Sequence, residues 1–310
     1  MDLICHYTRS ESAIKILKSK KLWATDYRFL DDAKENKIYL EILNRIISSS
    51  KNQANEKFLH DFMTFMLNKS RVYVCSFTKH NPEGSEHRYG NLAIARYFGK
   101  DNWVGLVFKE DSIFERLKSE SNTLGNLTKA CNSVYYIDPN TVATDIGLIE
   151  YIYQIYHNIY NENDLLDHLK KHWNISESDL KSTFYRKMGT LLSSFNSCKE
   201  FLGQNNYVAD LILHQIMVKH ICFKDEKEFR VTFQYLLDEQ DYSEFTTLVE
   251  PEPKPHLQFD FDYEDVEKII IGPGQNAIIT KDHLNEVLLI NKDTSGLGKR
   301  ILTSDIPWRT

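Results

Sequence analysis

The chain has 310 residues and a formal net charge of −6, with 42 % hydrophobic and 26 % charged residues. This composition is typical of a folded globular protein and excludes an intrinsically disordered chain. Proteins that bind duplex nucleic acid mainly through its phosphates are usually basic, so the acidic balance disfavours that class and leaves room only for a local basic groove.

The cysteine pattern predicts a reducing compartment. The five cysteines are odd in number, widely spaced and form no C-x-x-C pair, which also argues against a zinc site. The chain shows no basic-then-apolar leader and no apolar run near the roughly 18 residues that span a bilayer. We therefore expect a cytoplasmic protein that makes no membrane contact.

The first half of the chain alternates strand and helix patterns. Leu3–Tyr7 is a short apolar run typical of a strand, and an apolar stripe at helical spacing follows between Ala13 and Leu17. Thr8 and Ser10 are candidate N-caps for that helix. A short strand and a loop come next, then helices at about 34–49 and 56–68. Strands rich in β-branched and aromatic residues are expected at Arg71–Phe77 and Trp103–Phe108.

The second half begins with helical patterns and returns to strands. Residues from about 141 to 219 have a period near 3.6 and no strand pattern, which predicts a helical insertion. Strands are expected at Ser133–Ile137, within His220–Leu236 and before the Gly-Pro-Gly turn at Gly272, and a helix is expected close to the end. The sequence thus predicts one α+β domain over residues 1–310, with a mixed sheet built from both ends of the chain. Leu3–Tyr7 would then be an inner strand.

Two candidate binding stretches lie near the start of the chain. At the end of the first strand, His6 could donate or accept a hydrogen bond with a sugar hydroxyl, Tyr7 could stack on a ring, and Thr8 precedes a helix N-terminus that favours anions. A strand end with a capping threonine and a packed tyrosine explains the same triplet. Arg28 lies in the acidic stretch "DYRFLDD" and could bind a phosphate, although a solvated loop followed by the acidic first turn of a helix is the more ordinary explanation of this stretch.

Two further candidates lie later in the chain. The strand ending at Ser76 and Phe77 leads into a polar loop that reaches Tyr89, and loops after buried strands often carry sites. Within "FKDEKEFRVTF", strict alternation directs Glu226, Glu228 and Arg230 to one face. That face either forms part of a site or decorates an exposed edge strand with protective charges.

Five stretches together resemble a bacterial family known as domain of unknown function 2971. The first is an H-Y-T opening, here His6–Thr8, and the second is a D-x-R-[YF]-L-N-D-x-x-E stretch, here Asp26–Glu35. The third is an F-S-F-[ST] strand end with a W-R-x-Y-G loop, here Ser76–Gly90. The fourth is an E-x-E-[WF]-R strand, here Glu226–Arg230, and the fifth is a late I-I-x-G-P, which ends here at Pro273. The chain departs from the pattern at His87, where the family usually has Trp, and at Asp31, where it often has Asn.

The H-x-[ST] opening also resembles ADP-ribosyltransferases of the His-Tyr-Glu type. That resemblance implies NAD as a substrate, with His6 and Thr8 on its adenosine side and Glu228 as the catalytic acid residue. An aromatic side chain from the region between Ser76 and Tyr97 would stack on nicotinamide, and Arg28 or Arg230 would pair with the pyrophosphate. The full set expected to bind NAD is His6, Tyr7, Thr8, Arg28, Ser76, Phe77, Tyr89 and Arg230.

The resemblance implies an enzyme that cleaves the nicotinamide–ribose bond and passes ADP-ribose to a protein, a nucleic acid, a small molecule or water, as a bacterial toxin or phage-defence effector would. Two alternatives stay open. Asp138, Asp225 and Lys227 could hold Mg²⁺ and activate water in a nuclease. A non-enzymatic binding or sensor module could instead recruit a partner protein through the helical insertion.

Overall fold

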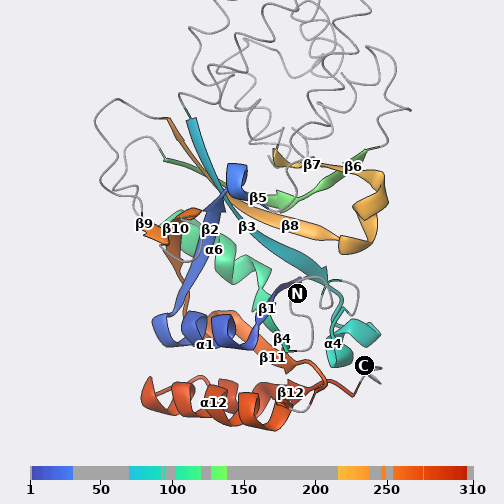
Figure 1. Ribbon diagram of the computed structural model, residues 1–310, viewed down its shortest axis with the longest axis vertical. Helices are drawn as coiled ribbons and strands as arrows, with labels where there is room; N and C mark the ends of the chain where they lie inside the picture. The colour runs from blue at the N-terminus through green and yellow to red at the C-terminus, as the bar shows by residue number, and fades with distance from the viewer. Residues whose placement is uncertain are drawn as a thin grey trace, which may run out of the picture.

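The computed structural model describes residues 2–30, 70–91, 94, 102–119, 127–137, 216–236, 246–248, 254–274 and 276–305 (Figure 1). These ranges form an α+β fold with a ten-stranded mixed sheet. The helices expected at 34–49 and 56–68, and nearly all of the expected helical insertion, lie outside them.

Eight strands of the sheet follow one path. Their order is β12 (Ile301–Thr303), β11 (Val266–Ile271), β4 (Trp103–Lys109), β1 (Leu3–Arg9), β3 (Ser70–His80), β2 (Lys21–Asp26), β10 (Lys254–Asp260) and β9 (Thr246–Leu248). Two further strands, β8 (Glu228–Leu236) and β5 (Leu127–Ser133), extend from β3, since β8 pairs with both β3 and β5. Strands β11 and β12 are parallel and the other pairs are antiparallel, which makes the sheet mixed.

The first strand lies inside the sheet, as the sequence predicts. Cys5 pairs with Thr78 of β3 on one side and with Val107 of β4 on the other. Strand β4 in turn pairs with β11, so segments from both ends of the chain share one sheet. The apolar run of β4 is buried on both faces from Trp103 to Phe108, which explains why it reads as uninterrupted hydrophobic sequence.

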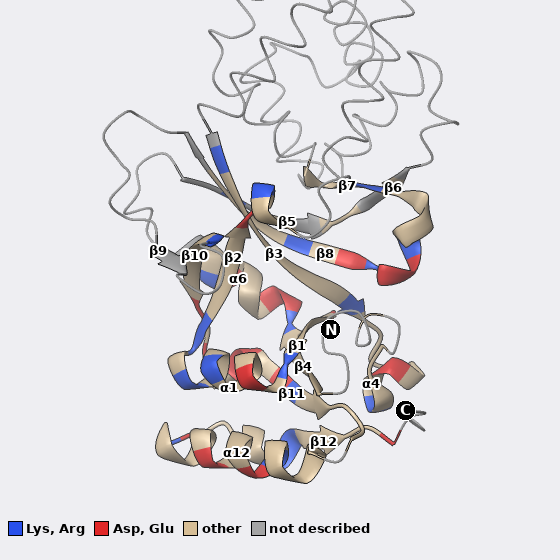
Figure 2. Cartoon of the chain, viewed as in Figure 1, with Lys and Arg blue, Asp and Glu red and all other residues tan. Residues whose placement is uncertain are grey.

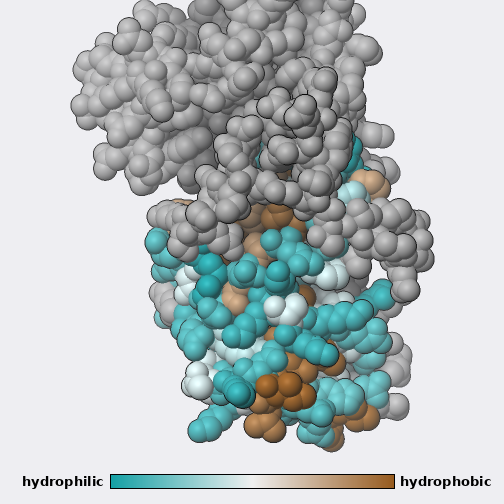
Figure 3. All heavy atoms as spheres, turned by 90° about the vertical axis from the view of Figure 1, so that its left-hand side faces the viewer, coloured by the Kyte–Doolittle hydropathy of each residue, from teal (hydrophilic) through white to brown (hydrophobic). Residues whose placement is uncertain are grey.

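Three helices contribute to the main hydrophobic core. Leu17 of α1 (Ser10–Ser19), Ile113 of α6 (Glu110–Ser119) and Leu284 of α12 (Ala277–Ile290) are buried in a cluster that also contains Phe108 and Phe233 of the sheet. Burying these apolar faces supplies the main driving force for folding. Figure 3 shows apolar side chains at the lower end of the molecule, where α12 lies and exposes Ile278, Ile279, Leu289 and Ile290.

Both predicted caps of the first helix are wrong. Thr8 belongs to β1, and Ser10 is the first residue of α1. The N-cap is Arg9, which makes no side-chain capping hydrogen bond. The backbone N–H of Ser10 donates instead to the carbonyl of Asn102 at 2.9 Å, so a tertiary contact replaces the local cap.

The predicted limit of the insertion also needs correction. Val218 and Lys219 belong to β7 (Val218–His220), a short strand that pairs in parallel with β6 (Tyr135–Ile137). A 3₁₀ helix, η4 (Ile221–Glu226), connects β7 to β8. The polar loop predicted after β3 likewise contains structure, because β3 continues to His80 and α4 (Ser85–Tyr89) follows. Within the described ranges, no helix has the length and apolar character to cross a membrane.

Replacing Gly272 by Ala tests how tightly this sheet packs. A Cβ atom there would lie 2.5 Å from Nε1 of Trp103, whose side chain is fully buried. We expect Gly272→Ala to lower the free energy of unfolding by about 1–3 kcal/mol, measured by urea denaturation, because a well-packed core resists added volume.

Gly298→Ala is the matched control. Its added Cβ would come no closer than 3.3 Å, to the side-chain oxygen of Asn285. We expect this variant to stay close to the wild type. Equal stability of the two variants would show that Trp103 can shift at little cost.

Candidate functional site

A fork in the sheet creates the candidate site. Strand β3 pairs with β1 from Thr78 to His80 and with β2 at Tyr73 and Val74, along the same edge. The stretch of β3 between these two pairings, residues 75–77, faces the gap where β1 and β2 separate. A pocket of about 310 Å³ opens at this point.

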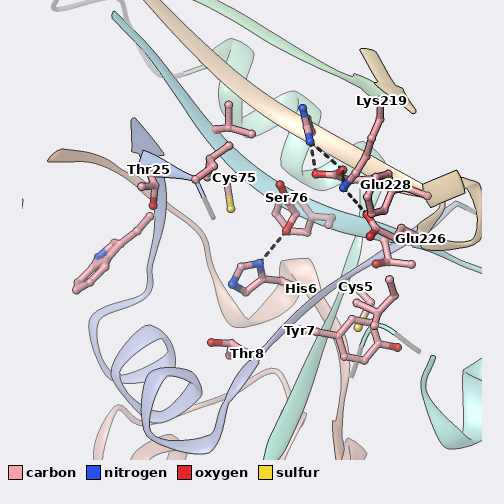
Figure 4. Close-up of a pocket in the computed structure, with 18 residues that line it drawn as sticks. Cys5, His6, Tyr7, Thr8, Thr25, Cys75, Ser76, Lys219, Glu226 and Glu228 are labelled. Atoms are coloured by element: carbon pink, nitrogen blue, oxygen red, sulfur yellow. Dashed lines mark hydrogen bonds and ion pairs between the residues drawn. The ribbon is translucent and has the colours of Figure 1, made fainter. Parts of the chain in front are cut away.

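Most of the pocket lining comes from five strands, β1, β2, β3, β7 and β8, and from the 3₁₀ helix η4. Its described lining residues are Cys5, His6, Tyr7, Thr8, Trp23, Thr25, Leu30, Val74, Cys75, Ser76, Phe77, Thr78, Ile94, Lys219, Phe223, Glu226, Glu228 and Arg230 (Figure 4). The set contains seven of the nine residues that the sequence nominates for the site: His6, Tyr7, Thr8, Ser76, Phe77, Glu228 and Arg230.

His6 bridges the fork. Its Nδ1 lies 3.0 Å from the carbonyl oxygen of Ser76. A carbonyl oxygen only accepts, so Nδ1 carries the proton in this bond and Nε2 of the neutral ring is an acceptor. Burial lowers the pKa of His6, although the bond to Ser76 opposes this effect, so the ring is neutral near pH 7. Figure 4 shows the ring between Ser76 and Thr8.

The Tyr7 side chain packs in the protein interior, between the sheet and the segment that contains Asn91. Its side chain is 6 % exposed and its ring meets that of Trp103 edge-on, with centroids 5.8 Å apart. Its hydroxyl accepts a 2.6 Å hydrogen bond from the backbone N–H of Asn91. These contacts leave little of the ring for stacking on a ligand, which is the role that the sequence suggests.

Glu228 is buried in an ion pair. Nε and Nη2 of Arg230 lie 2.8 and 2.9 Å from the two carboxylate oxygens, and Nζ of Lys219 lies 3.3 Å from one of them. Burial alone would raise the pKa of Glu228, but Arg230 and Lys219 together hold that pKa at about 2. The carboxylate is therefore ionised at neutral pH. Strand β8 lies between β3 and β5, so the alternative of an exposed edge strand is wrong for this segment.

Lys219 joins two carboxylates. Its Nζ lies 2.5 Å from Glu226 as well as near Glu228, and the side chain is almost completely buried. Figure 2 shows the acidic and basic residues that alternate over η4 and the start of β8. The described lining thus contains two cations and two carboxylates beside a neutral His6, so these groups balance. Sequence reasoning missed Lys219 because it assigned this residue to the helical insertion.

Two nominated residues lie outside the pocket lining. Arg28 binds Asp26, with Nε 2.9 Å from Oδ1 and Nη2 2.5 Å from Oδ2. This fork-to-fork pair occupies the guanidinium that the sequence assigns to a phosphate. The backbone carbonyl of Tyr89 accepts a hydrogen bond from the Ser304 hydroxyl at 2.8 Å. The Arg88 guanidinium lies over the ring of Tyr89.

The residues of the nuclease alternative are not gathered at the pocket. Asp225 and Lys227 are not among its lining, and Lys227 pairs with Glu86 at 2.9 Å. Asp138 lies outside the described residues. Across the part of the chain that the structure describes, no three His, Cys, Asp or Glu side chains are placed to hold a metal ion.

No protein-family model, curated protein or solved structure matches this chain. The two family resemblances therefore stay predictions, and the function has to be argued from the pocket.

Ionisation of Glu228 should make the free energy of unfolding depend on pH in the acidic range. Its folded-state pKa of about 2 lies below the ordinary value of 4.5, so its ionisation stabilises the fold above about pH 4.5 and this contribution is lost as the pH falls toward 2. This difference between the folded-state and ordinary pKa is equivalent to about 3 kcal/mol of folding free energy. We expect the free energy of unfolding to fall less steeply over this window in Glu228→Gln than in the wild type.

Urea denaturation across this pH window measures the effect. Glu228→Gln should also be less stable at neutral pH, because Arg230 loses its buried counter-charge. Glu286→Gln, an exposed change on α12, is the control and should keep the wild-type pH dependence. A parallel pH dependence in Glu228→Gln would contradict the assignment.

Proposed function

We propose that the pocket binds NAD as a substrate, cleaves its nicotinamide–ribose bond and passes ADP-ribose to an acceptor. The observation that carries this proposal is that His6 of β1 and Glu228 of β8, which lie far apart in the sequence, line one pocket. The sequence motifs nominate both residues for this chemistry independently of the structure.

The polar groups of the pocket suit a ribose. Nε2 of His6 is an acceptor for a hydroxyl proton, and Thr8 adds a hydroxyl on the same strand. On the other side, Ser76 and the Glu228 carboxylate offer further oxygen atoms. Balanced charges also favour an uncharged sugar here, since a phosphate would need a cation without a counter-charge.

The ionised carboxylate fits the reaction. When the C1′–N bond breaks, its electron pair goes to the pyridinium nitrogen and nicotinamide leaves as a neutral molecule. Positive charge then develops on the ribose as an oxocarbenium-like state, which a nearby carboxylate stabilises. An oxygen or nitrogen of the acceptor adds to C1′ and releases its proton. With a pKa of about 2, Glu228 carries the needed negative charge at neutral pH.

The contacts of Arg230 favour a different role from the one that the sequence suggests, and Lys219 shares that role. Arg230 contacts both oxygens of Glu228 and also donates to the carbonyl of Ile216. Lys219 bridges Glu226 and Glu228. We therefore assign both cations to orienting the carboxylates, and we expect the pyrophosphate to lie outside this cluster.

Glu228→Gln tests the catalytic role. Gln keeps the shape and one acceptor oxygen but loses the charge that stabilises the transition state. We expect kcat for nicotinamide release, measured without added metal, to fall roughly 10²- to 10³-fold with little change in KM.

Two comparisons make this test decisive. Glu286→Gln on α12 should keep wild-type kcat, and Glu228→Asp should keep part of it because the charge remains while its position shifts. If the wild type releases no nicotinamide from NAD, or if Glu228→Gln is as active as the wild type, the proposal is wrong.

His6→Asn separates the two roles of His6. The amide of Asn can still donate to the Ser76 carbonyl, but it lacks an atom in the place of Nε2. We expect a roughly 10-fold higher KM for NAD with an unchanged melting temperature, since about one hydrogen bond to the ligand is lost. His6→Ala should lower the melting temperature as well. An unchanged KM in His6→Asn would remove His6 from the binding site.

A further inference from the structure

Trp23 is an exposed aromatic side chain at the pocket. Its neighbours on β2, Leu22 and Ala24, are fully buried in the core, whereas Trp23 is 37 % exposed and lines the pocket. A large aromatic side chain left partly exposed beside a pocket often marks a binding surface.

A second ring holds the indole in place. The ring of His256 on β10 stacks on Trp23 with centroids 4.5 Å apart and an interplanar angle of 29°. His256 is 2 % exposed, and burial lowers its pKa, so it is a neutral flat ring near pH 7. Because His256 packs against one face of the indole, the side chain is oriented before a ligand arrives, which reduces the entropy lost on binding.

Trp23 belongs to the end of the pocket away from the charges. Thr25 shares its strand face, two residues along, and also lines the pocket. Figure 4 shows Thr25 on the opposite side of His6 from Lys219, Glu226 and Glu228. The pocket therefore has a charged end and an aromatic end, with His6 between them.

The other aromatic lining residues are less suited to stacking. Tyr7 and Phe77 are 6 % and 2 % exposed and pack into the core. Phe223 is 37 % exposed, but the Lys219 ammonium lies 4.9 Å from the centre of its ring. Among the tyrosines, Tyr73 of β3 is 1 % exposed in the core, Tyr89 is outside the lining, and Tyr97 lies outside the described residues.

From this arrangement we infer that Trp23 stacks on the adenine base of the bound dinucleotide, at the end of the pocket opposite to Glu228. The assignment to the adenine end rests on the proposed function. The nicotinamide ring must lie next to the bond that Glu228 acts on, at the charged end, so the base at the far end is the adenine. A stacked aromatic ring is well suited to this role because every base presents a flat π surface.

Calorimetric titration with ADP-ribose and with nicotinamide mononucleotide tests the inference. ADP-ribose contains the purine, and nicotinamide mononucleotide lacks it. We expect Trp23→Ala to weaken ADP-ribose binding roughly 5- to 150-fold, the range that corresponds to losing one stacked base. Trp23→Phe should retain most of the affinity, and neither change should alter binding of the mononucleotide.

Phe29→Ala is the matched control. Phe29 is 39 % exposed, follows the same strand and does not line the pocket. Phe29→Ala should bind both compounds as the wild type does, and Trp23→Ala and Trp23→Phe should remain folded at the temperature of the titration, as their melting curves check.

The outcomes separate this inference from the proposed function. Nicotinamide release by the wild type with unchanged ADP-ribose affinity in Trp23→Ala would overturn the role of Trp23 and leave the enzyme intact. Loss of ADP-ribose binding in Trp23→Ala, in a protein that releases no nicotinamide, would support the purine site and overturn the enzyme. A wild type that does not bind ADP-ribose, or a Trp23→Ala variant that loses the mononucleotide equally, would overturn the inference.

Discussion

The hydrogen bond between His6 and the Ser76 carbonyl is the contact on which the candidate site depends. One edge of β3 serves two strands, and the backbone of Ser76 lies in the gap between them. A buried carbonyl without a partner would cost free energy, so a fork in a sheet needs some other donor. His6 supplies that donor and is thereby fixed in one orientation. One hydrogen bond therefore has two effects: it gives the Ser76 carbonyl a partner, and it places the His6 ring in the pocket.

The buried charges follow a similar logic. An ionised carboxylate such as Glu228 is tolerated inside a protein only when cations and hydrogen bonds surround it. Arg230 and Lys219 meet that need, and Glu226 balances the second cation. Replacing any one of these charged residues alone should therefore destabilise the protein, because it leaves its partner buried without a counter-charge. The contacts with Arg230 and Lys219 hold the Glu228 carboxylate in a fixed geometry, which the reaction proposed for this pocket would require.

The sequence predicts those features that local patterns control. The inner strand β1, the doubly buried strand β4 and the α+β class follow from apolar runs and periodicity. Features set by distant partners were missed. Nothing near Glu228 shows that β5 covers the edge of its strand, and nothing near Ser10 shows that Asn102 replaces a cap. Trp23 and Lys219 become pocket residues only through long-range pairing, whereas His6 and Glu228 stand out because of their neighbours in sequence.

The fork also sets an order for assembly during synthesis. Strand β1 can pair with β3 and β4 once the chain has been made as far as Lys109, but the wall of the pocket that contains Glu228 and Arg230 requires β8, which ends at Leu236. Pairings between such distant segments raise the contact order and slow folding. A nascent chain therefore carries the His6 half of the pocket long before the carboxylate half is made. A chain that stops before β8 therefore cannot form the complete pocket, whatever ligand the pocket binds.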